Sequence, residues 1–406
     1  MTLRSLSRFC AIALGLAIAG CAARPPAPPP PPPMVVAPPA PLAANPLDRD
    51  MPNYLRLPSM PAGTPVRVGV ILPFSSAAPA TRALAASMMK AAQLAMFDAG
   101  NPRILLMTAD EGNGGASAAR AAQQLLSQGA EIIVGPLFGA SVSAIAPIAR
   151  DRAVPVLAFS TERNVAGDGA YLLSFLPRNE VRRVVSYAAA NGRRQFAALV
   201  PQTAYGDVTQ AAFQESVAAA KGNIVSLQRF APDAAAATAP AGRVAQSGAD
   251  AVFIPQGGTI LRAIAPTLSQ GGMARDKVKL LGTGLWDDAG LSREASLQGA
   301  WYAAPSPNVD ADFSAKYRAA FGAPPAQLAN LAYDAVSLVA LLSQGEPYRR
   351  FTPAALMDPN GFSGVNGIFR FNADGTSERG LAVLEVNAGG PVVVSPAPTT
   401  FLQPGF

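Results

Sequence analysis

The sequence predicts an α/β fold in which helices pack on parallel sheets. Short apolar runs typical of buried strands alternate with helical patterns of apolar residues along most of the chain. This alternation occurs in two successive sets of similar plan, within residues 66–160 and 196–288. Strands and helices at this spacing favour parallel strands joined by right-handed crossovers.

Composition and charge fit a packed chain that does not bind nucleic acid. Of the 406 residues, 50% are hydrophobic and 14% are charged, and the length suffices for two domains. The net charge is +6, of which Arg4 and Arg8 supply two, so the remainder carries +4 (6 − 2). No basic stripe is interleaved with aromatic residues, as nucleic-acid binding would require.

Residue usage also argues against an enzyme. Histidine is absent, and the cysteines, Cys10 and Cys21, both lie near the start of the chain. This excludes histidine-based triads, disulfides, thiol nucleophiles and cysteine or histidine metal sites from the folded part. No carboxylate pair accompanies a nucleophile in a motif, so we predict neither catalysis nor a cofactor.

The first 20 residues have the pattern of a signal peptide, with Arg4 and Arg8 before the apolar stretch Phe9–Gly20. Small residues and then Cys21 follow, which resembles the bacterial lipobox. The resemblance implies that Cys21 is lipidated and anchors the chain to a membrane without spanning it. Ala22 after the cysteine implies the outer membrane, with the chain facing the periplasm. An ordinary secretory cleavage is the alternative.

Residues 21–58 are predicted to form a proline-rich tether after the lipidated cysteine, and a globular part to occupy residues 65–390. Runs of proline favour an extended polyproline II backbone, which serves as a spacer or as a recognition segment. Residues 391–406 are apolar and proline-containing, and we expect a loose tail there.

Individual elements follow from these patterns. In the first set we predict strands at Val66–Leu72, Arg103–Thr108, Glu131–Val134 and Pro155–Ser160, and helices at Ala83–Ala99 and Ala116–Gln128. In the second set we predict strands at Phe196–Val200, Asn223–Arg229, Ala251–Pro255 and Val278–Gly282, and helices at Val208–Ala220, Ala241–Ser247 and Ile260–Ser269. Beyond them we predict helices at Phe313–Phe321, Leu328–Leu342 and Phe351–Met357, and a hairpin of Gly367–Phe371 with Leu381–Val386.

The stretch Glu131–Ser141 predicts one wall of a binding cleft. Its apolar run is ended by Gly135 and Pro136, and a helical pattern begins just after Gly139. In open α/β sheets, ligands bind at the carboxyl ends of strands, where helix N-termini present their N–H groups. Ser141 is either a ligand-binding hydroxyl here or an ordinary helix cap.

Several segments, spaced over some 320 residues, resemble type I periplasmic binding proteins of the leucine/isoleucine/valine-binding class. The segments are 68–74, 133–136, 154–160, 205–207, 333–336 and 364–375. The resemblance implies two Rossmann-like lobes with parallel sheets, joined by three crossovers and able to close by hinge motion. The first lobe would comprise about 66–177 and 305–362, and the second about 181–301 and 365–390.

Within this class, residues 135–138, 158–160 and 282–288 resemble penicillin-binding-protein activator (LpoA/LppC-type) lipoproteins. The resemblance implies regulation of peptidoglycan synthesis through binding of a synthase. The best-known activators carry a helical-repeat domain where this chain has the proline tether. The alternative is a receptor for branched-chain or related amino acids that feeds an ABC permease.

In amino-acid-binding members, hydroxyls of the first lobe hold the ligand carboxylate, and an acid and tyrosines of the second lobe hold the ammonium group. The resemblance therefore implies first-lobe hydroxyls at Ser141, Ser160 and Thr161, with Ser75 at the rim of the cleft. In the second lobe it implies Tyr205, Trp286 as an apolar wall, and Asp287 or Asp288 as the acid. Turn or cap roles are the alternative for Ser160, Thr161, Asp287 and Asp288.

Overall fold

A computed structural model describes residues 53–402, apart from 274–276, 289, 292 and 348. The predicted signal peptide, Cys21 and most of the predicted tether lie outside the described residues. In the described part of the chain, no helix is both long and apolar enough to cross a bilayer.

The first lobe is built on a six-stranded sheet with the order β1-β3-β2-β4-β5-β6. The strands are β1 (Tyr54–Arg56), β2 (Val66–Leu72), β3 (Ile104–Asp110), β4 (Ile132–Val134), β5 (Val156–Ala158) and β6 (Ala170–Leu172). All neighbours pair in parallel except β1, which lies antiparallel to β3. The tether was predicted to reach residue 58, but β1 already belongs to the sheet.

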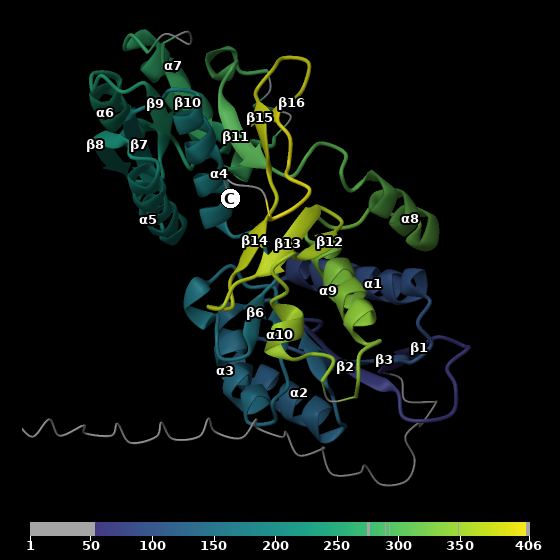
Figure 1. Cartoon of the computed structure of the whole chain (residues 1–406). Helices are drawn as coiled ribbons and strands as arrows, with labels where there is room; N and C mark the ends of the chain where they lie inside the picture. The colour runs from purple at the N-terminus through teal and green to yellow at the C-terminus, as the bar shows by residue number, and fades with distance from the viewer. Residues whose placement is uncertain (1–52, 274–276, 289, 292, 348, 403–406) are drawn as a thin grey trace, which may run out of the picture. The chain divides into compact units, whose positions relative to one another are not determined.

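Helices cover both faces of this sheet (Figure 1). The helices are α1 (Pro79–Ala99), α2 (Gly115–Ser127), α3 (Gly139–Arg150), α8 (Ala311–Phe321), α9 (Ala329–Leu342) and α10 (Pro353–Leu356). Side chains alternate along β2, so that Val68 and Val70 contact α1 and α9 while Ile71 packs with α2 and α3. Burial on both faces explains why β2 reads as a continuous apolar run.

The second lobe is built on a seven-stranded sheet with the order β16-β15-β11-β10-β9-β7-β8. The strands are β7 (Gln195–Pro201), β8 (Asn223–Phe230), β9 (Ala251–Phe253), β10 (Lys279–Gly282), β11 (Trp301–Ala304), β15 (Ala382–Glu385) and β16 (Val392–Ser395). The five strands from β8 to β11 are parallel, whereas β15 and β16 are antiparallel to their neighbours. Because β16 pairs with β15, the expectation of a loose tail after residue 390 is wrong for this segment.

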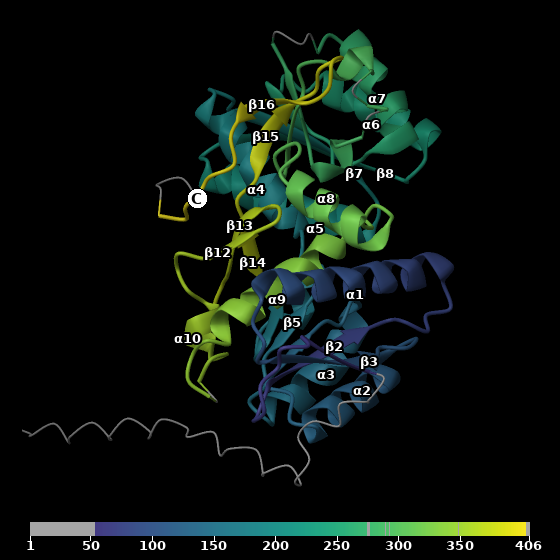
Figure 2. The same ribbon diagram turned by 90° about the vertical axis from the view of Figure 1, so that its right-hand side faces the viewer.

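Four helices flank the second sheet (Figure 2). Helices α4 (Pro177–Ala190) and α5 (Ala204–Ala219) share one core with the sheet, and α6 (Ala234–Ala245) and α7 (Gly258–Gln270) share the other. The sequence patterns missed α4, whose Pro177 occupies the first helical turn, a position that proline suits. The helix predicted from Val208 starts earlier than expected, because α5 begins at Ala204.

The predicted closing hairpin has the wrong partner strand. Strand β13 (Gly367–Phe371) turns at Asn372–Thr376 and pairs with β14 (Ser377–Arg379), and β12 (Phe362–Gly364) pairs with its other edge. The strand predicted at Leu381–Val386 is β15, which pairs with β11 in the second sheet. Phe369 and Phe371 pack into the core of the first lobe.

Candidate functional site: two strand-end edges and one cavity

The loop after β4 is fixed by a buried carboxylate. Gly135 has a φ of +92°, and a Cβ at this position would lie 2.0 Å from the carbonyl oxygen of Ile71, so only glycine fits. Glu111 has no exposed surface and accepts hydrogen bonds from the N–H groups of Leu137 at 2.9 Å and Phe138 at 3.1 Å. Glu111 therefore determines where the chain enters α3.

Ser141 is fully buried, next to the Glu111 carboxylate. Burial raises the pKa of Glu111, although the hydrogen bonds from the Leu137 and Phe138 N–H groups and the nearby Ser141 hydroxyl act in the opposite direction. Within the described residues, the Ser141 Oγ itself has no partner at hydrogen-bond geometry. Ser141 is also not the cap of α3, because Phe138 occupies that position. The structure thus directs this predicted ligand-binding hydroxyl toward the protein interior.

The other hydroxyls of the first lobe lie in turns after β5 and β2. The Ser160 hydroxyl is buried and accepts the N–H of Glu162 at 3.1 Å, the turn role considered as its alternative. Thr161 is exposed beside it. The exposed Ser75 donates its N–H to Oδ1 of Asp110 at 3.1 Å. The pKa of Asp110 is lowered. Burial alone would raise this pKa, but hydrogen bonds from the Ser75 hydroxyl and from nearby N–H groups outweigh burial.

Glu162 lies over the first turn of α3. A Cβ built on Gly139 would come within 2.4 Å of the Glu162 carboxyl carbon, so the carboxylate lies directly above this glycine. A ligand carboxylate approaching this helix N-terminus would meet a negative charge of the chain itself. The sequence patterns did not single out this residue.

In the second lobe, the carboxyl ends of β7 and β10 bring four polar groups together, which we call the strand-end cluster: Glu180, Tyr205, Thr283 and Gly284. Thr203 caps α5 by accepting the Gly206 N–H at 3.1 Å, which places Tyr205 in the first turn. The Tyr205 hydroxyl donates to Oγ1 of Thr283 at 2.9 Å.

Glu180 is the acidic group of this cluster, and the sequence patterns missed it. It lies in the first turn of α4, and its Oε2 accepts the Gly284 N–H at 2.9 Å. Burial raises the pKa of Glu180 to about 7, although that N–H acts in the opposite direction. Burial and the charge of Glu180 also raise the pKa of Tyr205, so its hydroxyl stays a neutral donor. Among the described residues, no lysine or arginine forms an ion pair with Glu180.

Trp286 and Asp287 lie outside the strand-end cluster. The chain continues from Gly284 through a 3-10 turn, and the Trp286 ring packs on Gly282, where a Cβ would approach it to 2.1 Å. The indole N–H donates to the carbonyl oxygen of Gln256 at 2.9 Å. The carboxylate of Asp287 instead accepts the Tyr302 hydroxyl at 3.1 Å.

These residues line a cavity of about 190 Å³, which we call the hairpin cavity. Trp286, Asp287, Asp288 and Tyr302 form one side of it, and Val386 and Pro391, from the connection between β15 and β16, form the other. Neither Tyr205 nor Glu180 lines it. The residues predicted as one second-lobe constellation therefore divide between two places.

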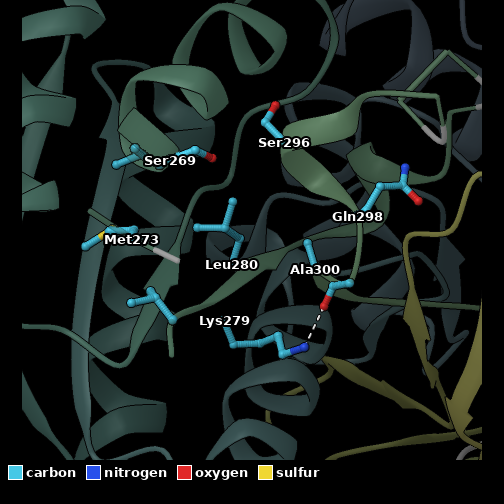
Figure 3. Close-up of a pocket in the computed structure, with 10 residues that line it drawn as sticks. Ser269, Met273, Lys279, Leu280, Ser296, Gln298 and Ala300 are labelled. Carbon is cyan, nitrogen blue, oxygen red and sulfur yellow. Dashed lines mark hydrogen bonds between the residues drawn. The ribbon is translucent and has the colours of Figure 1, made fainter. Parts of the chain in front are cut away.

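A second cavity in this lobe, of about 10 Å³, lies between α7 and β10 (Figure 3). Lys279 beside it donates to the carbonyl oxygen of Gly299 at 2.7 Å. Such a volume holds at most about one water molecule, so it cannot accept a solute. Among the described residues, no group of carboxylates could hold a metal ion.

Two large sheets with helices on both faces, and with polar groups gathered at strand ends, form an architecture suited to holding a small ligand. Residues 65–391 match the periplasmic binding protein family, and the chain belongs to that family. Membership implies a periplasmic location. No curated protein matches the sequence.

Solved structures with this fold include transporter proteins. A putative branched-chain amino acid ABC transporter protein from Rhodospirillum rubrum is 17% identical, with a TM-score of 0.71, covering 81% of this chain and 100% of its own. A leucine-binding protein from Thermotoga maritima is 20% identical, with a TM-score of 0.55 and coverages of 81% and 98%. A solute-binding protein from Rhodopseudomonas palustris, in complex with 3,4-dihydroxybenzoic acid, is 20% identical, with a TM-score of 0.57 and coverages of 84% and 98%.

Proposed function

We propose that this protein is a periplasmic receptor that binds a small solute bearing an ammonium group and delivers it to an ABC permease. Family membership supports the receptor class. The observation that carries the ligand class is Glu180, a half-buried acid at the strand ends with no cationic partner among the described side chains. A carboxylate in such surroundings is stabilised by a cation that hydrogen-bonds to it, and a ligand ammonium supplies one.

The remaining contacts follow from the geometry of the two edges. Tyr205 would orient the ammonium group beside Glu180, because its hydroxyl is already fixed by Thr283. For the ligand's other end, the exposed Ser75 and Thr161 are the candidates, because Ser141 is buried next to Glu111 and the Ser160 hydroxyl accepts the Glu162 N–H. Of the two ligand types named for the similar structures, an amino acid carries an ammonium group and a dihydroxybenzoate does not. We therefore expect an amino acid or a related amine.

Thermal unfolding of the purified protein with amino acids and 3,4-dihydroxybenzoate tests this proposal. A ligand that binds only the native state stabilises it by about 2.7 kcal/mol at a hundred times its Kd. We expect an amino acid such as leucine to raise the Tm, and Glu180→Gln and Tyr205→Phe to abolish the increase. Asp287→Asn, in the hairpin cavity, is the matched control and should keep it. A shift that survives Glu180→Gln, or a panel without any shift, would refute the ligand assignment.

The second candidate function is regulation of peptidoglycan synthesis from the outer membrane, through a synthase. It is favoured by the lipobox-like pattern that ends at Cys21 and by the activator-like residues 282–288. Radiolabelled palmitate should be incorporated into the native chain but not into Cys21→Ser. Capture from envelope membranes distinguishes the two functions, since a receptor should recover a permease and an activator a peptidoglycan synthase.

A further inference from the structure

The hairpin cavity has room for a ligand of several heavy atoms. Its volume of about 190 Å³ exceeds the 10–15 Å³ or so that one water molecule requires by more than tenfold. Its walls come from three separate elements: the turn after β10, strand β11, and the connection between β15 and β16. Because β15 follows β10 by about a hundred residues in the sequence, only the folded sheet creates this cavity.

The two aromatic walls are rigid. Trp286 and Tyr302 are each 2% exposed. The Trp286 indole N–H donates to the carbonyl oxygen of Gln256, and the Tyr302 hydroxyl donates to the Asp287 carboxylate. These two hydrogen bonds fix the orientation of both rings. Burial, together with the charge of Asp287, raises the pKa of Tyr302, which keeps the phenol neutral. The parts of the two rings that border the cavity are therefore apolar and carry no positive charge.

The charged groups that line the cavity are the carboxylates of Asp287 and Asp288, and neither forms an ion pair with a described lysine or arginine. Asp287 and Asp288 are both exposed. Among the described residues, the Asp287 carboxylate accepts only the Tyr302 hydroxyl, and the Asp288 carboxylate accepts only the Gly290 N–H, at 2.7 Å. The Arg262 guanidinium lies near Gly290, as the Asp288 carboxylate does, but Arg262 forms an ion pair with neither Asp287 nor Asp288. Two carboxylates beside an apolar and aromatic lining favour an organic cation over an anion or a neutral solute.

We propose that the hairpin cavity is a second binding site, separate from the strand-end cluster, for a small organic cation such as a quaternary ammonium compound. The apolar part of the cation would contact Trp286, Tyr302, Val386 and Pro391, and its charge would face Asp287 and Asp288. Occupancy would tie the connection of β15 and β16 to the turn after β10. This site requires no ligand at Glu180, so it stands whether or not the proposed function does.

Tryptophan fluorescence can report on this site because the chain has two tryptophans, Trp286 and Trp301. Trp301 does not line the cavity and packs on Tyr187 and Lys279. Trp301→Phe makes Trp286 the single reporter. We expect choline to change its emission saturably, and 3,3-dimethyl-1-butanol, its uncharged isostere, to leave it unchanged.

The variants locate the bound cation. Asp287→Asn with Asp288→Asn keeps the hydrogen-bond acceptors and removes both charges, and we expect choline to bind at least about tenfold more weakly. Tyr205→Phe should leave choline binding intact. Calorimetric titration of the unsubstituted protein repeats the measurement should Trp301→Phe fold poorly. The proposal would be overturned if choline showed no saturable binding or if the uncharged isostere bound equally well. It would also be overturned if the double substitution left choline binding unaffected, or if Tyr205→Phe abolished it.

Discussion

At the scale of single residues, Glu180 differs from every acid that the sequence patterns suggested. It reaches the strand ends from α4, 104 positions before the Gly284 N–H that it accepts. Asp287 has the expected residue type at the expected strand end, but its carboxylate faces Tyr302. A motif gives a residue's place in the sequence, whereas the direction of its side chain depends on what packs around it.

Glu180 should make stability depend on pH near neutrality. The pKa of Glu180 is raised from 4.5 to about 7 in the folded protein, so the folded state binds a proton more tightly than the unfolded state does. Proton binding by Glu180 therefore contributes its full stabilisation below about pH 4.5, and this stabilisation is lost as the pH rises through 7. The shift of 2.5 (7 − 4.5) corresponds to about 3 kcal/mol. Urea unfolding between pH 5 and 8 should show a smaller fall in the free energy of unfolding for Glu180→Gln than for the unsubstituted protein. Parallel pH profiles would contradict this.

At the scale of elements, the loop between β4 and α3 depends on one glycine and one acid. Gly135 allows the chain to pass the backbone of β2, and Glu111 then binds the two N–H groups that follow. The residue pattern showed where β4 ends, but not that a buried acid from the end of β3 holds the loop.

Gly135→Ala should be strongly destabilising, because the added Cβ would lie 2.0 Å from a backbone oxygen that cannot move without displacing β2. We expect a loss of about 3 kcal/mol or more in urea unfolding. Gly100→Ala is the matched control: it has a positive φ of +59° and open space around the Cβ position, so only about 1 kcal/mol should be lost. Equal losses of unfolding free energy in the two variants would show that the positive φ, and not the clash of the added Cβ, determines the cost.

At the scale of the whole molecule, the segments that connect the two sheets meet around a buried ion pair. Arg379 and Asp334 side chains are each 1% exposed and lie 3.7 Å apart. Arg379 donates from Nε to the carbonyl oxygen of Ser174 at 3.2 Å, and Asp334 accepts the Val365 N–H at 2.7 Å. The pair therefore joins α9 and β14 to the chain before α4 and the chain after β12.

Removing both members of this pair should cost less than the sum of the two single removals. Asp334→Ala or Arg379→Met leaves a buried charge without its partner and should lower the free energy of unfolding by about 3–5 kcal/mol. In the double variant no uncompensated charge remains, so its loss should be smaller than the sum of the two single losses. Denaturant unfolding of the four proteins gives the coupling energy. Additive losses would contradict a mutual dependence.

Local pattern recovered most elements, and its errors have identifiable causes. Strand β2 was predicted with its observed ends because a strand buried on both faces is apolar throughout. Helix α4 was not predicted because its first residue, Pro177, falls at the predicted end of the first lobe, although proline is well suited to a first helical turn. The hairpin was wrong because two later strands could each pair with β13, and only the sheet determines which one does.

The sequence by itself determined the alternating α/β architecture, the family resemblance and the absence of histidine and cysteine chemistry in the folded part, since periodicity and composition are local properties. Tertiary structure decided that Ser141 faces Glu111, that Glu180 is the acid beside Tyr205, and that Trp286 borders a cavity with β15 and β16. These contacts join residues far apart in the chain. They depend on how strands and helices pack, which no short stretch of sequence specifies.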